Sequence, residues 1–161
     1  PKLPLNARNL QFKVPEKAQV FRLRKKESNH QSHAILGAYA PSFRDDDRLM
    51  MNLLINYLGG PAMNARLNVV IREKYGLAYT VEASYSSFVD SGFWQIYFGC
   101  EDKNIQRTMD LIHKELAKFR SKEMSSIQLQ RAKQQFKGQM ALGMDVNADG
   151  KVCKALATYN A

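Results

Sequence analysis

The sequence has few of the residues that build disulfide frameworks, structural metal sites or nucleophile centres. Its 161 residues include two cysteines, Cys100 and Cys153, which lie outside any Cys-x-x-Cys or Cys/His cluster, so we expect two packed thiols. It contains no Gly-x-Ser-x-Gly elbow and no lysine-containing phosphate loop. No apolar run approaches the roughly 20 residues that cross a bilayer. We therefore expect this portion to be soluble with no membrane span, and nothing in it indicates a compartment.

Acidic residues are outnumbered by basic ones, 15 to 24, which gives a net charge of +9. Such a charge attracts nucleic acid, anionic membranes or acidic peptides. The basic residues are nevertheless spread over predicted helix faces, apart from a denser run at residues 22–26. No basic helix interleaved with aromatics accompanies them. We interpret the charge as a solvated surface and predict no nucleic-acid partner. Salt-sensitive binding that depends on residues 22–26 would favour that alternative.

Residues 58–88 carry the strongest pattern in the chain. Gly59 and Gly60 are expected to end one helix through their permissive dihedrals, and Pro61 is expected to open the next. Apolar residues then recur at helical spacing and predict one buried face. The members of that face are Met63, Leu67, Val70 and Ile71.

A turn and a strand follow this helix. Gly76 can adopt a left-handed conformation without a Cβ clash and is predicted to end the helix. From residue 78 the pattern alternates with a period of two, which is typical of a strand. Arg72 closes the helix and Tyr79 opens the strand, so we expect a tight turn to hold both near one corner. One face of the strand is predicted to contain Tyr79, Val81, Ala83 and Tyr85.

The rest of the chain predicts helices and short strands without regular βαβ alternation. Three aspartates at positions 45–47 favour a helix start, followed by an apolar face of Leu49, Met50, Leu53, Leu54, Tyr57 and Leu58. Residues 93–100 are apolar on both faces, which indicates an interior strand. Such a chain favours an α+β fold with helices packed on one mainly antiparallel sheet. Further strands are expected at residues 19–24 and 33–40, and further helices at 105–119, from a cap at Ser125 or Ser126, and from about residue 149.

A family resemblance rests on IREKYGLAYTV, preceded by LGGPAMNARL and followed by SYSSFVDSGFWQIYFGC. This series resembles the second half of the pitrilysin/insulinase zinc metallopeptidases, the family that contains mitochondrial processing peptidase. HAILGAYAPSF upstream and LQRAKQQFKGQMAL downstream fit the same family, so the resemblance covers most of the chain beyond about residue 19. An ordered series of motifs at the right spacings is far more specific than one short pattern.

The resemblance implies a domain organisation. Residues 1–18 are expected to be a polar lead-in or linker, and residues 19–161 a peptidase C-terminal, substrate-binding domain that is incomplete at its C-terminus. The chain begins at Pro1 without a signal-type segment, so we expect a fragment of a larger protein.

The resemblance also implies where the metal lies. In this family the catalytic half carries His-x-x-Glu-His on a helix, with two histidine ligands and a glutamate general base. This chain has three histidines, His30, His33 and His113, and none belongs to such a motif. His30 and His33 fall across a predicted turn and strand, where a spacing of three does not align side chains. We therefore expect no zinc or other cofactor in this chain, and zinc in a catalytic half of the parent polypeptide or of a partner subunit.

Arg72 and Tyr79 match two family positions that reach the substrate near the zinc. The resemblance implies that they are auxiliary residues that bind the scissile carbonyl and its oxyanion, with no catalytic residue in this chain itself. From the residues alone, a surface arginine at a helix end and a tyrosine packed in a sheet are the favoured explanation, and the family resemblance shifts the preference to the functional role. The strand at residues 78–87 is a further candidate for contact with substrate backbone, beside an ordinary structural role.

Two functions follow from the resemblance. The first is the zinc-less, substrate-binding half of a metalloendopeptidase that cleaves peptides or unfolded segments, whose activity would belong to the full-length parent. The second is a non-catalytic structural or partner subunit of the same fold, similar to the core proteins of a respiratory complex. Retention of both Arg72 and Tyr79 favours the peptidase, because a structural subunit has no chemical need for the pair.

Overall fold

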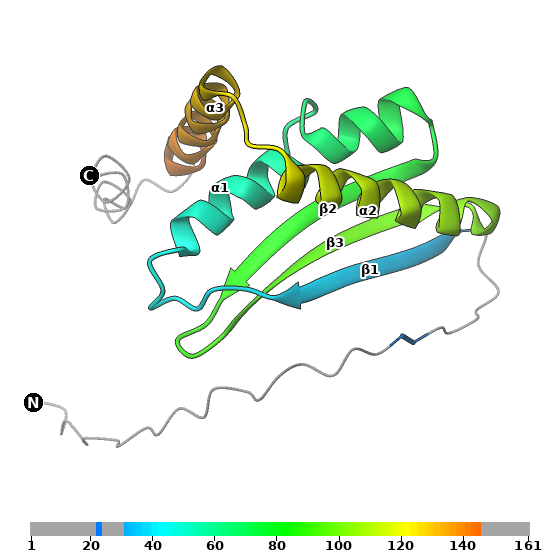
Figure 1. Ribbon diagram of the computed structural model, residues 1–161, viewed down its shortest axis with the longest axis horizontal. Coiled ribbons are helices and arrows are strands. Elements are labelled where there is room, and N and C mark those ends of the chain that lie inside the picture. Colours follow the sequence, from blue (N-terminus) through cyan, green and yellow to red (C-terminus); the bar gives the residue numbers. More distant parts are fainter. Residues whose placement is uncertain (1–21, 24–30, 146–161) are drawn as a thin grey trace, which may run out of the picture.

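The computed structural model describes residues 22–23 and 31–145 and contains one antiparallel sheet (Figure 1). Its strands are β1 (Ser32–Tyr39), β2 (Ala78–Ser87) and β3 (Gly92–Cys100), in the order β1-β3-β2. β3 pairs with both neighbours, so the prediction of an interior strand at residues 93–100 is confirmed. Three predicted segments lie outside the described residues: the lead-in at 1–18, the helical segment from about residue 149, and most of the strand at 19–24. Residues 22–23 of that strand are described, and they are not in a strand.

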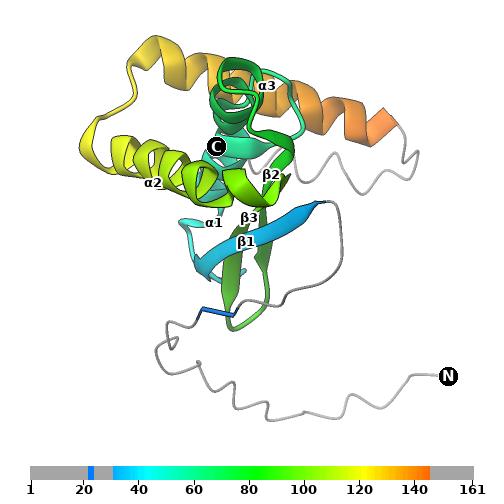
Figure 2. The same ribbon diagram turned by 90° about the vertical axis from the view of Figure 1, so that its right-hand side faces the viewer.

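The helices all lie on the same side of this sheet, where α3 packs against α1 rather than against the strands (Figures 1 and 2). They comprise α1 (Arg48–Gly59), the π-helical segment η1 (Asn68–Lys74), the short 3-10 turn η2 (Asp102–Asn104), α2 (Ile105–Ser121) and α3 (Ser126–Asp145). The predicted α+β layer of helices on an antiparallel sheet is therefore confirmed. No helix in the described part of the chain is long and apolar enough to cross a membrane.

The hydrophobic core lies between β3 and the helices. Alternate residues of β3 point into it, because side chains on a strand alternate between the two faces. Phe98 pairs with Val81 of β2, and both are buried. The other fully buried large side chains are Leu67, Ile71, Ile96 and Ile112.

A buried polar pair lies in the same core. The Thr108 hydroxyl is buried without a hydrogen-bond partner among the described residues, and the buried thiol of Cys100 lies beside it. Burial raises the pKa of that thiol, and the hydroxyl offsets only part of the rise. Cys100 is therefore a packed thiol as expected, while Cys153 lies outside the described residues.

The buried face of α1 differs from the prediction. Met50 and Leu54 were expected inside, but Met50 is 59% exposed and Leu54 is also exposed. The buried residues are Ile55, Leu58 and Gly59. Outside the polar stripe of Arg48, Asn52 and Asn56, the side chains of α1 are mostly apolar, so periodicity does not decide which part of this wide apolar surface is buried, and packing against β2 selects it.

The glycine pair at the end of α1, Gly59 and Gly60, provides space rather than unusual dihedrals. A Cβ at Gly59 would lie 2.8 Å from the Cβ of Ala83, so the missing side chain lets α1 approach β2 closely. Gly60 has a φ of −66° and a ψ of −178°, which any residue adopts. The prediction of permissive dihedrals here was wrong, because the chain leaves α1 in an extended conformation.

The next helix also begins later than predicted. Residues 61–65 form bends and turns, and helical structure starts at Arg66 rather than at Pro61. The Ala65 N–H donates to the Ala62 carbonyl at 2.9 Å, so a tight turn takes the place of the first helical turn. Met63 lies in this turn and is 73% exposed, so it is not part of the apolar face as predicted.

The position of α3 depends on polar contacts. The Ser125 hydroxyl accepts a hydrogen bond from the Gln128 N–H, and the Gln128 side chain accepts one from the Ser125 N–H. This reciprocal arrangement is a capping box, and it confirms Ser125 as the cap. Two amide pairs, Asn56–Gln139 at 2.5 Å and Asn64–Gln135 at 2.8 Å, then attach one side of α3 to α1 and the following turn.

Candidate functional site

The corner between η1 and β2 is built by a left-handed glycine. Gly76 has a φ of +58°, the only positive φ among the described glycines. Its N–H donates to the Arg72 carbonyl at 3.1 Å, and the Leu77 N–H donates to the Ile71 carbonyl at 3.0 Å. These bonds satisfy carbonyls at the end of the helix. The predicted role of Gly76 is confirmed, and its rigid turn fixes the direction in which β2 leaves.

Arg72 lies in the last turn of η1, one residue after the buried Ile71. Its side chain is exposed, and its guanidinium makes no hydrogen bond or ion pair with another described residue. The arginine therefore contributes little to the packing of this domain. Its five N–H donors are available to an acceptor outside the described chain.

Tyr79 lies at a β-bulge. Ala78 pairs with Cys100 and Thr80 pairs with Gly99, so Tyr79 is an extra residue in β2. It is 57% exposed, whereas Val81 is buried. The prediction that Tyr79 shares the face of Val81 was wrong, because the bulge interrupts the period of two.

The Tyr79 hydroxyl has a polar neighbour, Glu101, which directly follows β3. Lys103 lowers the pKa of Glu101, mainly through a hydrogen bond and through its positive charge. The Tyr79 hydroxyl lowers the same pKa to a smaller extent. Glu101 and Lys103 form an ion pair at 2.7 Å. Arg72 and Tyr79 thus lie on either side of the Gly76 turn, both exposed, and no described hydrogen bond joins them.

The histidines do not converge in the described part of the chain. His33 is exposed on β1, where its Nδ1 lies 2.8 Å from the Tyr97 hydroxyl and the rings stack with centroids 5.9 Å apart. His113 is exposed on α2, as expected, and His30 lies outside the described residues. No group of three His, Cys, Asp or Glu side chains among the described residues has metal-binding geometry. The described donor set therefore does not fit a zinc ion.

Comparison with known families gives the chain its place. The family model described as "Peptidase M16 inactive domain" matches residues 3–136, which is most of the sequence. The chain belongs to this family. The zinc protease YmxG of Bacillus subtilis is 32% identical over 124 residues, which cover 77% of this chain and 30% of the relative. A zinc protease of Streptomyces coelicolor is 33% identical over 115 residues, which cover 71% of this chain and 25% of the relative.

Solved structures share the fold of this M16 inactive domain. A peptidase M16 inactive domain from Pseudomonas fluorescens superposes with a TM-score of 0.64 at 23% identity, covering 69% of this chain and 27% of that one. A conserved protein from Enterococcus faecalis superposes with a TM-score of 0.70 at 23% identity, covering 91% of this chain and 33% of that one. The chain spans about a third or less of the proteins that it matches.

The structure of the M16 inactive domain also contains a charged cluster that the sequence reading missed. Glu115 of α2 is buried, and its carboxylate contacts Arg66 Nε at 2.7 Å and Lys118 Nζ at 2.6 Å. Burial alone would raise the pKa of Glu115, but hydrogen bonds from Lys118 and Arg66 outweigh it, and the pKa is lowered. Only the Glu115–Lys118 spacing of three along a helix signals this cluster in the sequence, since Arg66 lies 49 positions away.

Proposed function

We propose that this M16 inactive domain is the substrate-facing half of a zinc metalloendopeptidase that cleaves peptides or unfolded segments. Zinc would be held by another half that carries His-x-x-Glu-His, either in the same polypeptide or on a partner subunit. Three findings support this proposal: the family, the zinc-protease names of its relatives, and the fact that the chain spans only 30% of YmxG.

The observation that carries the proposal is the exposed, unpaired guanidinium of Arg72 beside the rigid Gly76 turn. A charged side chain on a well-fixed backbone corner, with no partner among the described residues, is suited to bind a group on another molecule. Its planar donors can bind the carbonyl oxygen of a peptide and then the oxyanion that develops there.

Tyr79 would supply the second donor. The β-bulge directs it away from the buried face of β2, and its phenol is exposed. The hydroxyl lies near the Glu101 carboxylate and contributes to its lowered pKa, so a substrate carbonyl would compete with that carboxylate for the hydroxyl proton. Because Glu101 is also paired with Lys103, its carboxylate keeps a partner when Tyr79 turns to the substrate.

The test uses the full-length parent, purified with any partner that co-purifies. Zinc content and cleavage of a quenched fluorescent peptide mixture are measured for the wild type, Arg72→Ala and Tyr79→Phe. Loss of an oxyanion donor lowers kcat by about 100- to 1,000-fold in well-studied cases, and we expect at least a 10-fold loss of kcat/KM for each variant with zinc retained. Arg120→Ala and Tyr39→Phe are matched controls, because both residues are exposed and lie outside this corner.

The outcomes separate the two functions. If the controls and the two variants are equally active, Arg72 and Tyr79 have no role at the scissile carbonyl. If the parent contains no zinc and cleaves nothing, the structural subunit replaces the peptidase as the proposed function.

A further inference from the structure

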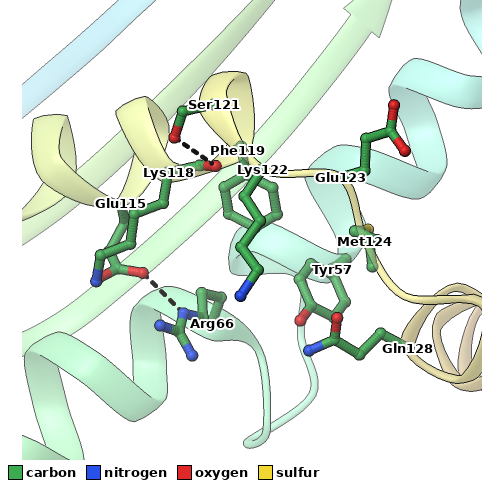
Figure 3. Close-up of a pocket in the computed structure, with 10 residues that line it drawn as sticks. All are labelled: Tyr57, Arg66, Glu115, Lys118, Phe119, Ser121, Lys122, Glu123, Met124 and Gln128. Carbon is green, nitrogen blue, oxygen red and sulfur yellow. Dashed lines mark hydrogen bonds and ion pairs between the residues drawn. The ribbon is translucent and has the colours of Figure 1, made fainter.

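We propose that a pocket between α1, α2 and the start of α3 binds ligands that join a carboxylate to an apolar group. Its volume is about 310 Å³, at the lower end of the range for small-ligand sites. Neither Arg72 nor Tyr79 lines it, so it is a second site, separate from the proposed catalytic corner. The residues that carry the argument are Tyr57, Arg66, Lys118, Phe119, Lys122 and Met124 (Figure 3).

A buried carboxylate holds the cations in place. The Glu115 side chain is 4% exposed, and its two oxygens accept separately, Oε2 from Arg66 and Oε1 from Lys118. Arg66 uses only its Nε in this contact, so both of its Nη groups lack a partner among the described residues. Glu115 therefore positions a guanidinium whose outer donors remain available for a ligand.

The facing side of the pocket adds two more donors. The Lys122 side chain extends between Arg66 and Tyr57, while the carboxylate of Glu123 points away from them (Figure 3). Neither the Lys122 ammonium nor the Tyr57 hydroxyl has a hydrogen-bond partner within the described residues. An ammonium and a guanidinium only donate, so this set favours an anion.

The charge balance points the same way. Arg66, Lys118 and Lys122 contribute three positive charges, and Glu115 and Glu123 contribute two negative charges. One positive charge therefore remains on the pocket lining, and a single carboxylate on the ligand neutralises it.

Apolar surface lies directly beside these donors. The rings of Tyr57 and Phe119 meet edge to face with centroids 5.7 Å apart, and Met124 also lines the pocket. Inorganic phosphate would use the donors but leave this surface wet. A carboxylate attached to an aromatic or aliphatic group uses both, which describes a peptide's C-terminal residue or a small organic acid.

The test measures binding to the full chain by calorimetry, with N-acetylphenylalanine as the probe and its C-terminal carboxamide as the matched uncharged ligand. We expect the carboxamide to bind at least 10-fold more weakly. Lys122→Gln should weaken the acid about 10-fold, because it removes one charge-assisted hydrogen bond. Arg120→Gln makes the same charge change on α2 outside the pocket and should weaken it less than about 2-fold.

A second variant tests the donor geometry without changing charge. Tyr57→Phe keeps the ring that packs on Phe119 and removes only the hydroxyl, so it should weaken the acid about 3-fold, while thermal unfolding should change little. A pentapeptide ending in phenylalanine, with a free or an amidated terminus, then distinguishes a peptide C-terminus from a small organic acid.

Three results would overturn the proposal: no binding of any acid, equal binding of acid and carboxamide, or an Arg120→Gln effect as large as that of Lys122→Gln. The last result would show attraction by the overall charge of +9 rather than a site. The assay involves neither zinc nor cleavage, so its outcome is independent of the proposed peptidase function.

Discussion

The buried Glu115 carboxylate allows a test of how much its cationic partners contribute to the stability of this fold. Arg66→Met removes one of its two cationic partners while keeping an unbranched apolar stem. The Glu115 side chain is 4% exposed in the wild type, and in the variant Lys118 is the only partner of its carboxylate that remains. Removal of one partner from a buried ion pair leaves a charge that the interior does not solvate, so we expect a large loss of stability.

The magnitude follows from the exposure of each partner. A hydrogen bond to a charged group contributes about 1.5–3 kcal/mol, and Arg66 is 41% exposed, which screens part of that interaction. We therefore expect Arg66→Met to lower the free energy of unfolding by about 2 kcal/mol. For a chain of this size, that corresponds to a fall in Tm of about 4–8 °C.

The double variant Arg66→Met/Glu115→Leu decides whether this reasoning is correct. It removes the buried charge together with its partner, and Lys118, which is 52% exposed, can turn to water. An apolar replacement of a buried ion pair is often neutral or stabilising, so we expect the double variant to lie within about 1 kcal/mol of the wild type. Urea unfolding of all variants at pH 7 measures this, with Lys103→Met as a control on an exposed ion pair. A double variant less stable than Arg66→Met would refute the argument.

The same cluster predicts a dependence of stability on pH. The pKa of folded Glu115 lies below its ordinary value of 4.5, so the folded state releases this proton more readily than the unfolded state does. The resulting stability is fully present above about pH 4.5 and is lost as the pH falls through the lowered pKa. The difference in unfolding free energy between wild type and Glu115→Gln should therefore be larger at pH 7 than at about pH 3.

Substitutions of Gly76, Gly59 and Thr108 test the backbone and the core by thermal or urea unfolding. Gly76→Ala should lower the free energy of unfolding by about 1–2 kcal/mol, because φ is +58° there, although a Cβ would meet no atom within 4 Å. Gly76→Asn should cost less. Equal stability of the alanine variant and the wild type would contradict the left-handed turn. Gly59→Ala should lower the free energy of unfolding by about 1–3 kcal/mol, because the new Cβ clashes with Ala83. Adding Ala83→Gly should restore part of that stability. If it restores none, the strain lies elsewhere. Thr108→Val should leave the free energy of unfolding unchanged or raise it by up to about 1 kcal/mol, because the buried hydroxyl has no hydrogen-bond partner among the described residues. A loss above about 1 kcal/mol would show instead that the hydroxyl forms a hydrogen bond with Cys100.

Elements with one clear apolar stripe were predictable from the sequence. In α2, Ile105, Met109 and Ile112 recur at helical spacing and pack on the core, and the helix matches the one predicted at residues 105–119. In β3, apolar residues on both faces predicted the central position that its two pairings confirm. Gly76 was also predictable, because few other residues adopt the left-handed conformation.

Elements with several equivalent faces were not predictable in detail. α1 is apolar over all of its surface except the stripe of Arg48, Asn52 and Asn56, so only its contact with β2 at Gly59 decides that Ile55 is buried and Met50 exposed. Likewise, the alternating pattern after Gly76 contains no sign of the bulge that turns Tyr79 outward. A bulge depends on how the partner strand is registered, and that information lies in residues about 20 positions away.

The sequence by itself determined the α+β class and the family, and it singled out Arg72 and Tyr79 as candidates for substrate contact. These follow from local periodicity and from motif order, which are properties of neighbouring residues. The tertiary structure alone decided which face of α1 is buried, where Tyr79 points, and how Arg66 meets Glu115 across 49 positions to form the floor of a pocket. Such features depend on contacts between distant segments, and no local pattern of apolar and polar residues encodes them.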